Sequence, residues 1–235
     1  MTRTALLRLA GPLAAWGDVA VDHHRPTNAL PTLSALVGLI GAALGYDRAD
    51  ANALAGLQSR FIYAARADRP GSPLLDFQTA RLRGNDVGWT TRGELFKRAG
   101  GAQTYKNPHI RFRHYIADGA WTVALQLSSG SPDVDAVAVA LMHPARPLYL
   151  GRRSCSPSSR ILLHVVDAPD VLTALRSTSP APGAVETMPA CWPLGLDEES
   201  PASVVTVTDI RDWQAGWHAG QRQQVEGMLR VSGGV

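Results

Sequence analysis

The stretch TLSALVGLIGAAL, residues 32–44, decides the fold because it predicts an amphipathic helix. The segments before and after it predict short strands. Thr32 is a suitable N-cap, and Gly45 suits the position just after the last turn. TALLRL, residues 4–9, precedes the helix and SRFIYAAR, residues 59–66, follows it, and both predict strands. The apolar positions that fit one helical face are Leu33, Leu36, Val37, Ile40 and Leu44.

The second half of the chain repeats this order. AWTVALQL, residues 120–127, predicts a strand, DVDAVAVALM, residues 133–142, a helix, and RILLHVV, residues 160–166, a strand. Strand, helix, strand, strand, helix, strand is the split βαβ pattern, so we expect an α+β, ferredoxin-like (RRM-like) domain. Further predicted elements are short helices over 50–57 and 170–176 and a late strand over 203–208.

An insertion of about fifty residues separates the second and third strands. Connections longer than about 15 residues are usually functional or disordered. This one carries aromatic residues among its arginines, so we predict an ordered β-hairpin with its tip around Gly100-Gly101. The stretch 177–202, rich in Pro and Ser, predicts a surface loop. The expected units are 1–66 with 116–168 as the core domain, 67–115 as the hairpin, and 169–235 as a small β-rich C-terminal portion.

Composition excludes several classes of protein. The chain has 235 residues, 45% hydrophobic and 18% charged, which is typical of a folded chain with a sizeable core. No apolar run reaches the about 20 residues of a membrane span, and no signal peptide is evident. Cys155 and Cys191 are the two cysteines, and they predict neither a disulfide framework nor a metal site. We therefore expect a cytoplasmic protein without a cofactor.

Charge is unevenly distributed along the chain. Residues 78–115 hold eight basic and two acidic side chains, a net charge of +6. Residues 146–163 hold four arginines and no acid, whereas 164–210 carry a net charge of −6. Clustered positive charge steers polyanions, and the arginine fork matches phosphate groups. Codon bias explains much of the arginine content but not its clustering.

The turn PLYLGRRSCSP, residues 147–157, is the most informative motif. Glycine lets a backbone approach a ligand closely, and neighbouring Arg and Ser donate hydrogen bonds to phosphates. Tyr149 offers a ring for a base. The alternative is a solvated basic turn with Tyr149 in the core. Arg25, Thr32 and Ser34 precede or open the first helix, where free N–H groups favour anions, although these residues taken alone favour ordinary capping.

The histidines in the insertion allow an alternative function, that of an RNA-cleaving enzyme. His23 and His24 are adjacent, so in a strand they face opposite sides and make a poor metal pair. A metal-independent endoribonuclease would need a general acid and base, and this region offers Tyr105, Lys106, His109 and His114. The other interpretation is that these groups contact RNA without chemistry, and we favour it.

Three separated motifs carry a family resemblance. LRLAGPLAAWG at 7–17, RPTNALPTLSALVGLIGAALG at 25–45 and YLGRRSC at 149–155 occur in the order found in the Cas-five family of type I-E CRISPR Cascade subunits. The chain resembles this family from about residue 3 to residue 217, and the basic insertion sits where the family has its thumb hairpin. The tail 218–235 has no counterpart in the resemblance.

The resemblance implies a non-catalytic subunit that holds the 5′ handle of the CRISPR RNA and caps the backbone filament. Its partners would be the backbone subunit and the large subunit that reads the PAM, with target DNA met through the complex and no membrane involved. Some type I-C relatives cut the repeat RNA, which keeps the nuclease alternative open. By motif, the RNA contacts would be Arg25, Thr32, Ser34, Tyr149, Arg152, Arg153, Ser154 and Cys155. By charge, the hairpin would add Lys106, His109, Arg111 and Arg113.

Overall fold

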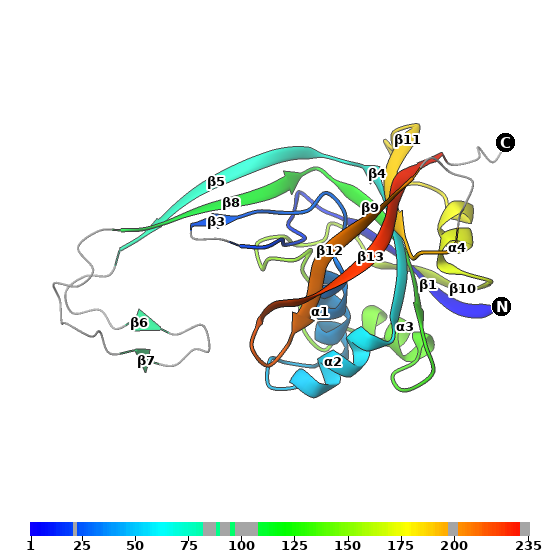
Figure 1. Ribbon diagram of the computed structural model, residues 1–235, viewed down its shortest axis with the longest axis horizontal. Helices are drawn as coiled ribbons and strands as arrows, with labels where there is room; N and C mark the ends of the chain where they lie inside the picture. Colours follow the sequence, from blue (N-terminus) through cyan, green and yellow to red (C-terminus); the bar gives the residue numbers. More distant parts are fainter. Residues whose placement is uncertain (21–22, 82–87, 90–94, 97–107, 197–201, 231–235) are drawn as a thin grey trace.

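The structure is a computed structural model, and it describes residues 1–20, 23–81, 88–89, 95–96, 108–196 and 202–230. Its centre is a seven-stranded sheet made of β1 (Thr2–Ala10), β4 (Phe61–Arg69), β9 (Ala120–Leu127), β10 (Leu162–Ala168), β11 (Thr187–Trp192), β12 (Ser203–Asp212) and β13 (Trp217–Arg230). The strand order is β10-β1-β9-β4-β11-β13-β12, and every neighbouring pair is antiparallel (Figure 1). The expected α+β class is therefore confirmed.

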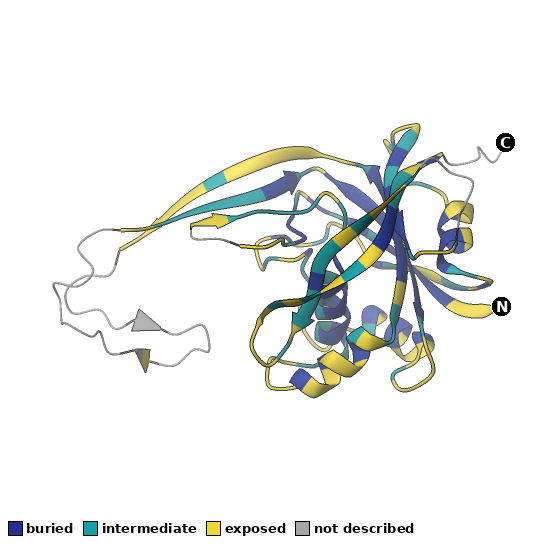
Figure 2. Cartoon of the chain, viewed as in Figure 1, coloured by how far each residue is buried: buried dark blue, intermediate teal, exposed yellow. Residues whose placement is uncertain are grey.

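Helices cover both faces of this sheet. They are α1 (Leu33–Leu44), α2 (Ala51–Ser59), α3 (Val134–Met142) and α4 (Val171–Ser177). Because strand side chains alternate, Leu7 and Val123 pack with α1 and α3 on one face, whereas Leu6 and Ala124 pack with α4 on the other. The helices bury the sides turned to the sheet and expose the others (Figure 2). None of the helices in the described part of the chain is long and apolar enough to cross a membrane.

The C-terminal region extends the same sheet. The prediction of a surface loop over 177–202 was wrong, because β11 lies inside it and pairs with β4 and β13. The strand carries the buried residues Met188, Ala190, Cys191 and Trp192. Pro189 interrupts their pattern in the sequence, which hid the strand. Residues 218–230 lie in β13, so this part of the tail belongs to the sheet.

A hairpin projects from the body of the molecule (Figure 1). Its strands are β5 (Ser72–Ala80) and β8 (His109–Ala117), which pair antiparallel from Ser72↔Ala117 to Ala80↔His109. Two short strands join the other edge of β8, namely β2 (Leu13–Ala14) and β3 (His24–Arg25), and β3 runs parallel to it. Beyond the hairpin, β6 (Gly88–Trp89) pairs with β7 (Leu95–Phe96). The expected tip at Gly100-Gly101 lies outside the described residues.

A buried ion pair joins α4 to the sheet. Arg66 Nε donates to the Asp68 carboxylate at 2.6 Å, and neither side chain is accessible to solvent. The other Arg66 nitrogens donate to the carbonyls of Leu175 and Thr178, and Thr122 donates to Asp68. Every strong donor and acceptor of the pair is thus satisfied, as burial of charge requires.

Candidate nucleic-acid interface

The basic turn is packed tightly against the N-terminal segment. Leu150 and Cys155 are fully buried, and Leu150 N–H donates to the Cys155 carbonyl at 2.7 Å. The Leu150 carbonyl accepts from Ala15 N–H at 3.0 Å. Gly151 adopts a φ of +93°, and a Cβ there would lie 1.8 Å from the Ala15 carbonyl oxygen. The glycine is therefore required by the close approach of two backbones, and the turn presents its arginines from a fixed base.

Arg152 joins this turn to the hairpin. Its guanidinium donates to the His114 carbonyl on β8 and to the Arg25 carbonyl on β3, both at 2.8 Å. The same group lies over the Tyr115 ring, 4.7 Å from its centroid. The Tyr115 hydroxyl lies 3.4 Å from the Ser154 hydroxyl. The neighbouring Arg153 is exposed and lines the groove described below.

One face of the hairpin is cationic. Alternation along β8 places His109, Arg111 and Arg113 on the same face as Tyr115. Arg25 of β3 is opposite Arg113 in the parallel pairing, so the two side chains share this face. Arg111 Nη1 lies 3.0 Å from His23 Nδ1. Arg111 and Arg113 of β8 and Arg25 of β3 are thus gathered beside the basic turn, and Asp76 of β5 lies opposite Arg113 on the same face.

The other face of the hairpin is aromatic. His24 stacks on Phe112 with ring centroids 4.9 Å apart, and Phe77 lies 5.3 Å from Phe112. The ring of His114 lies 6.4 Å from that of His24. His109 and His114 are five residues apart in one strand, so they face opposite sides and their Cα atoms are separated by ~16 Å. The expected set containing both histidines therefore does not form one acid–base site, and Tyr105 and Lys106 lie outside the described residues.

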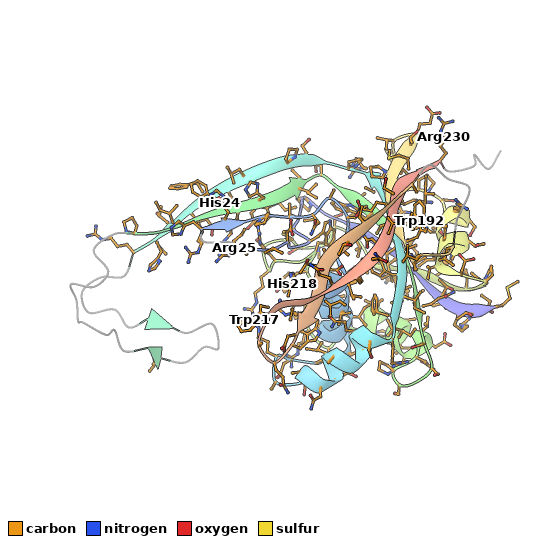
Figure 3. The ribbon with its side chains drawn as sticks, viewed as in Figure 1. His24, Arg25, Trp192, Trp217, His218 and Arg230 are labelled. Atoms are coloured by element: carbon orange, nitrogen blue, oxygen red, sulfur yellow. The ribbon has the colours of Figure 1, made fainter. Side chains whose placement is uncertain are left out.

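A large groove opens between the basic turn, α1 and the end of the β12–β13 hairpin. Its volume is about 1110 Å³. Six arginines and two aspartates line it, together with aromatic residues from four segments. The charged lining residues are Arg25, Arg48, Arg146, Arg152, Arg153, Arg211, Asp18 and Asp47, and the aromatic ones include Trp16, Tyr46, Tyr149 and Trp213. Figure 3 shows Arg25 at the hairpin and His218, another lining residue, on β13.

The charges in this groove are not balanced internally. A hydrogen bond from Ala49 N–H, and after it the ion pair with Arg146 at 3.4 Å, keeps the pKa of Asp47 below its usual value. Burial and the neighbouring Arg48 lower the pKa of Arg211. Six arginines against two aspartates give the groove lining a net positive charge, which attracts an anionic ligand.

The start of α1 forms one wall of the groove through capping contacts. Thr32 is the N-cap; its buried hydroxyl accepts from Ala35 N–H and donates to the Trp16 carbonyl at 2.6 Å. The Ser34 hydroxyl lies 3.0 Å from His218 Nε2. Burial, followed by the nearby Arg211, lowers the pKa of His218. The helix start is thus built from satisfied polar groups.

A carboxylate from the sheet completes this helix start. Asp209 of β12 accepts from Leu33 N–H at 2.8 Å and from Arg222, also at 2.8 Å. Arg222 in turn donates to the buried Tyr63 hydroxyl at 2.6 Å, and burial raises the pKa of that hydroxyl well above its usual value. The Tyr63 hydroxyl donates to the Pro31 carbonyl at 3.1 Å. Strands from the C-terminal region therefore fix the helix that borders the groove.

This chain is similar in sequence to CRISPR-associated proteins. The family model of the CRISPR-associated protein Cas5 matches residues 4–225. The chain belongs to the Cas5 family. It is 33% identical to the CRISPR system Cascade subunit CasD of Escherichia coli (strain K12) over 183 residues, which cover 77% of this chain and 79% of that protein.

Solved structures agree with this membership. A chain of a CRISPR RNA-guided surveillance complex aligns with a TM-score of 0.67 and 26% identity, covering 97% of this Cas5 chain and 90% of that one. A crystal structure of a Cas protein aligns with a TM-score of 0.57 and 26% identity, covering 97% of this chain and 95% of that one. The alignments include most of the tail that the sequence resemblance left without a counterpart.

The structure of this Cas5 chain brings most of the predicted site residues into one region. Tyr149 and Arg153 line the groove with Arg25, whereas Thr32 and Cys155 are buried, and burial raises the pKa of the Cys155 thiol. The sequence-based predictions did not include a second set of groove residues, which lies in the loop after α1 and in the β12–β13 hairpin: Tyr46, Arg48, Arg211, Trp213 and His218. The motif RDWQAGWH at 211–218 was the available signal, because a turn with two Trp and a basic residue is unusual on a solvated surface.

Proposed function

We propose that this Cas5 chain is a non-catalytic, RNA-binding subunit of a type I-E Cascade surveillance complex, and that its groove holds the 5′ handle of the guide RNA. The observation that carries the proposal is the groove with six arginines and interleaved aromatic rings, continuous through Arg25 with the cationic hairpin face. Proteins that bind single strands combine a positive channel with aromatic stacking platforms.

In this proposal some groove residues bind phosphates, others stack on bases, and others shape the wall of the groove. Exposed Arg153 and partly buried Arg25 contact phosphates, because a guanidinium donates to phosphate oxygens in a planar fork. Tyr149 and Trp213 stack on bases, which is worth about 1–3 kcal/mol per base. Thr32, Ser34, Ser154 and Cys155 act mainly by shaping the wall. Hydrogen bonds to ribose hydroxyls favour RNA over DNA.

The fold supports an assignment of the parts. We propose that residues 1–66 and 116–168 form a ferredoxin-like core, since the order β10-β1-β9-β4 with α1 and α3 on one face is the arrangement that the split βαβ pattern produces. Residues 67–115 form the thumb, which contacts the guide where the handle meets the spacer. The C-terminal portion, 169–235, braces α1. The proposed neighbours are the backbone subunit and the large PAM-reading subunit, and target DNA is met through the complex.

Binding of the full-length chain to handle RNA tests the proposal. RNA and DNA of the same sequence are titrated at several salt concentrations. Arg153→Ala is compared with Arg160→Ala, which removes the same charge from an exposed position that does not line the groove. We expect RNA to bind more tightly than DNA, and only Arg153→Ala to reduce the log–log salt slope, by about 0.7 for each phosphate that is no longer neutralised. Equal effects of the two variants, or equal affinity for RNA and DNA, contradict the proposal.

A metal-independent endoribonuclease is the second candidate. The observation in its favour is the pair His24 and His114, whose rings lie 6.4 Å apart on the aromatic hairpin face. Two such groups can supply the acid and the base of RNA cleavage. Incubation of the purified chain with repeat RNA in EDTA decides between the candidates. A discrete product that disappears in both His24→Ala and His114→Ala supports the nuclease, and intact RNA supports the binding subunit.

A further inference from the structure

Arg152 occupies the junction between the two surfaces proposed to bind RNA. The turn that carries it is anchored to Ala15 through the Leu150 carbonyl. From that base its guanidinium reaches two different strands, donating to His114 on β8 and to Arg25 on β3. These strands form the root of the hairpin, whereas the turn itself lines the groove.

The surroundings of this guanidinium are those of a packing group. It is partly buried, it lies over the Tyr115 ring at 4.7 Å, and two of its N–H groups are used by carbonyls at 2.8 Å. Arg153, one position along, is exposed and faces the groove. The two adjacent arginines therefore have different roles. Arg152 connects the basic turn to β8 and β3, and Arg153 is available to a ligand.

We infer that Arg152 is a positioning residue that fixes the hairpin relative to the groove, so that one RNA strand binds both surfaces at once. This inference rests on the proposed function. Two sites on one rigid body turn the second contact into an intramolecular event with a high effective concentration, and a loosened joint lowers that concentration. Without Arg152 the groove and the hairpin each still bind RNA, but the gain in affinity from binding both at once is reduced.

Lysine is not expected to replace this residue. An ammonium is a compact point charge, whereas the guanidinium fork donates to two carbonyls while its flat face lies on a ring. Arg152→Lys keeps the charge and removes that geometry. It therefore separates positioning from simple attraction of phosphates.

The test compares two RNAs on the full-length chain. The short RNA is the handle alone, and the long RNA adds the adjoining spacer nucleotides that reach the hairpin. Tethering of this kind supplies up to about 10²–10⁴-fold in affinity. We expect Arg152→Ala and Arg152→Lys to lose at least about tenfold of the advantage that the long RNA has over the short one. Arg153→Ala, the matched control, should weaken both RNAs by a similar factor.

Hydrogen exchange gives a readout that does not depend on RNA. Phe112 N–H of β8 donates to the His23 carbonyl at 2.9 Å, so its exchange reports the contact between β8 and the β3 segment. We expect faster exchange at Phe112 in both Arg152 variants and unchanged exchange in Arg153→Ala.

Four outcomes overturn the inference. Equal weakening of short and long RNA in Arg152→Ala, or full rescue by lysine, makes Arg152 a phosphate contact. Retention of the whole long-RNA advantage together with unchanged exchange makes the junction independent of Arg152, while leaving the proposed function in place. A wild-type chain that gains nothing from the longer RNA overturns the proposed function of the hairpin, and this inference fails with it.

Discussion

Replacement of Gly151 by alanine tests how strictly the basic turn is built. Gly151 has a φ of +93°, and an added Cβ would lie 1.8 Å from the Ala15 carbonyl oxygen and 2.8 Å from its carbon. Both obstacles are backbone atoms, which cannot rotate away as a flexible side chain can. The turn and the Ala15 segment must therefore separate, and the hydrogen bond from Ala15 N–H to the Leu150 carbonyl breaks.

The expected cost has two parts. A left-handed conformation costs an L-residue with a Cβ about 1–2 kcal/mol. Separation of the segments removes a hydrogen bond worth about 0.5–1.5 kcal/mol and some buried packing of Leu150. We therefore expect Gly151→Ala to lower the free energy of unfolding by about 2–4 kcal/mol. Because the same turn carries Arg152 and Arg153, affinity for handle RNA should fall as well.

Gly195 provides a matched control. Its φ is +80°, similar to that of Gly151, but a Cβ there would meet nothing within 4 Å. Gly195→Ala therefore measures the conformational cost alone, about 1–2 kcal/mol. Urea denaturation of both variants gives the difference, and an RNA titration under native conditions gives the functional effect. Equal destabilisation by the two variants, or full RNA affinity in Gly151→Ala, refutes the argument that a close backbone approach shapes the site.

Other features lead to further predictions. Asp68→Ala leaves Arg66 buried without its partner and should destabilise the chain by about 3–5 kcal/mol in urea denaturation; a decrease below about 1 kcal/mol contradicts the buried pair. Because burial lowers the pKa of His218, the unfolded chain binds the proton more readily, so stability should fall as the pH drops from about 6.5 through the lower pKa of the folded state. His218→Gln should remove that part of the pH dependence, and identical profiles for both proteins count against it. Burial raises the pKa of Cys191 to about 12 and also raises that of Cys155, so iodoacetamide at pH 8 should label neither thiol until urea is added; rapid labelling of the native chain contradicts their burial.

The sequence predicted the central elements because each has a strong local signal. The helix over 32–44 has its N-cap, its apolar face and its terminal glycine, and α1 occupies Leu33–Leu44. The strand over 120–127 coincides with β9, whose residues are almost all buried. In both cases local propensity and tertiary burial favour the same structure, so a short window of sequence was sufficient.

The C-terminal strands could not be read in the same way. Pro189 lies within β11, a strand that is paired on both sides, and proline is rarely found in such strands. Glycines and polar residues in β13 gave no clear alternation, although the strand runs from Trp217 to Arg230. Their strand conformation depends on pairing with distant parts of the chain. A local pattern therefore could not identify them.

Part of the candidate interface could not be identified from the sequence either. Arg152 and Arg153 look equivalent in the sequence, and the structure separates them by their contacts. Arg211 and Trp213 reach the groove through the β12–β13 hairpin, directly after the segment 164–210, whose net charge is negative. Regional charge describes the average of a segment, whereas a binding site depends on which side chains the fold brings together.

The central claim is that the arginine-lined groove holds the guide RNA, and a structure of the reconstituted complex with its guide tests this most directly. We expect handle phosphates within hydrogen-bonding distance of Arg25 and Arg153, with at least one base stacked on Tyr149 or Trp213. A guide that passes elsewhere on the protein, leaving these guanidinium groups in solvent, would contradict it.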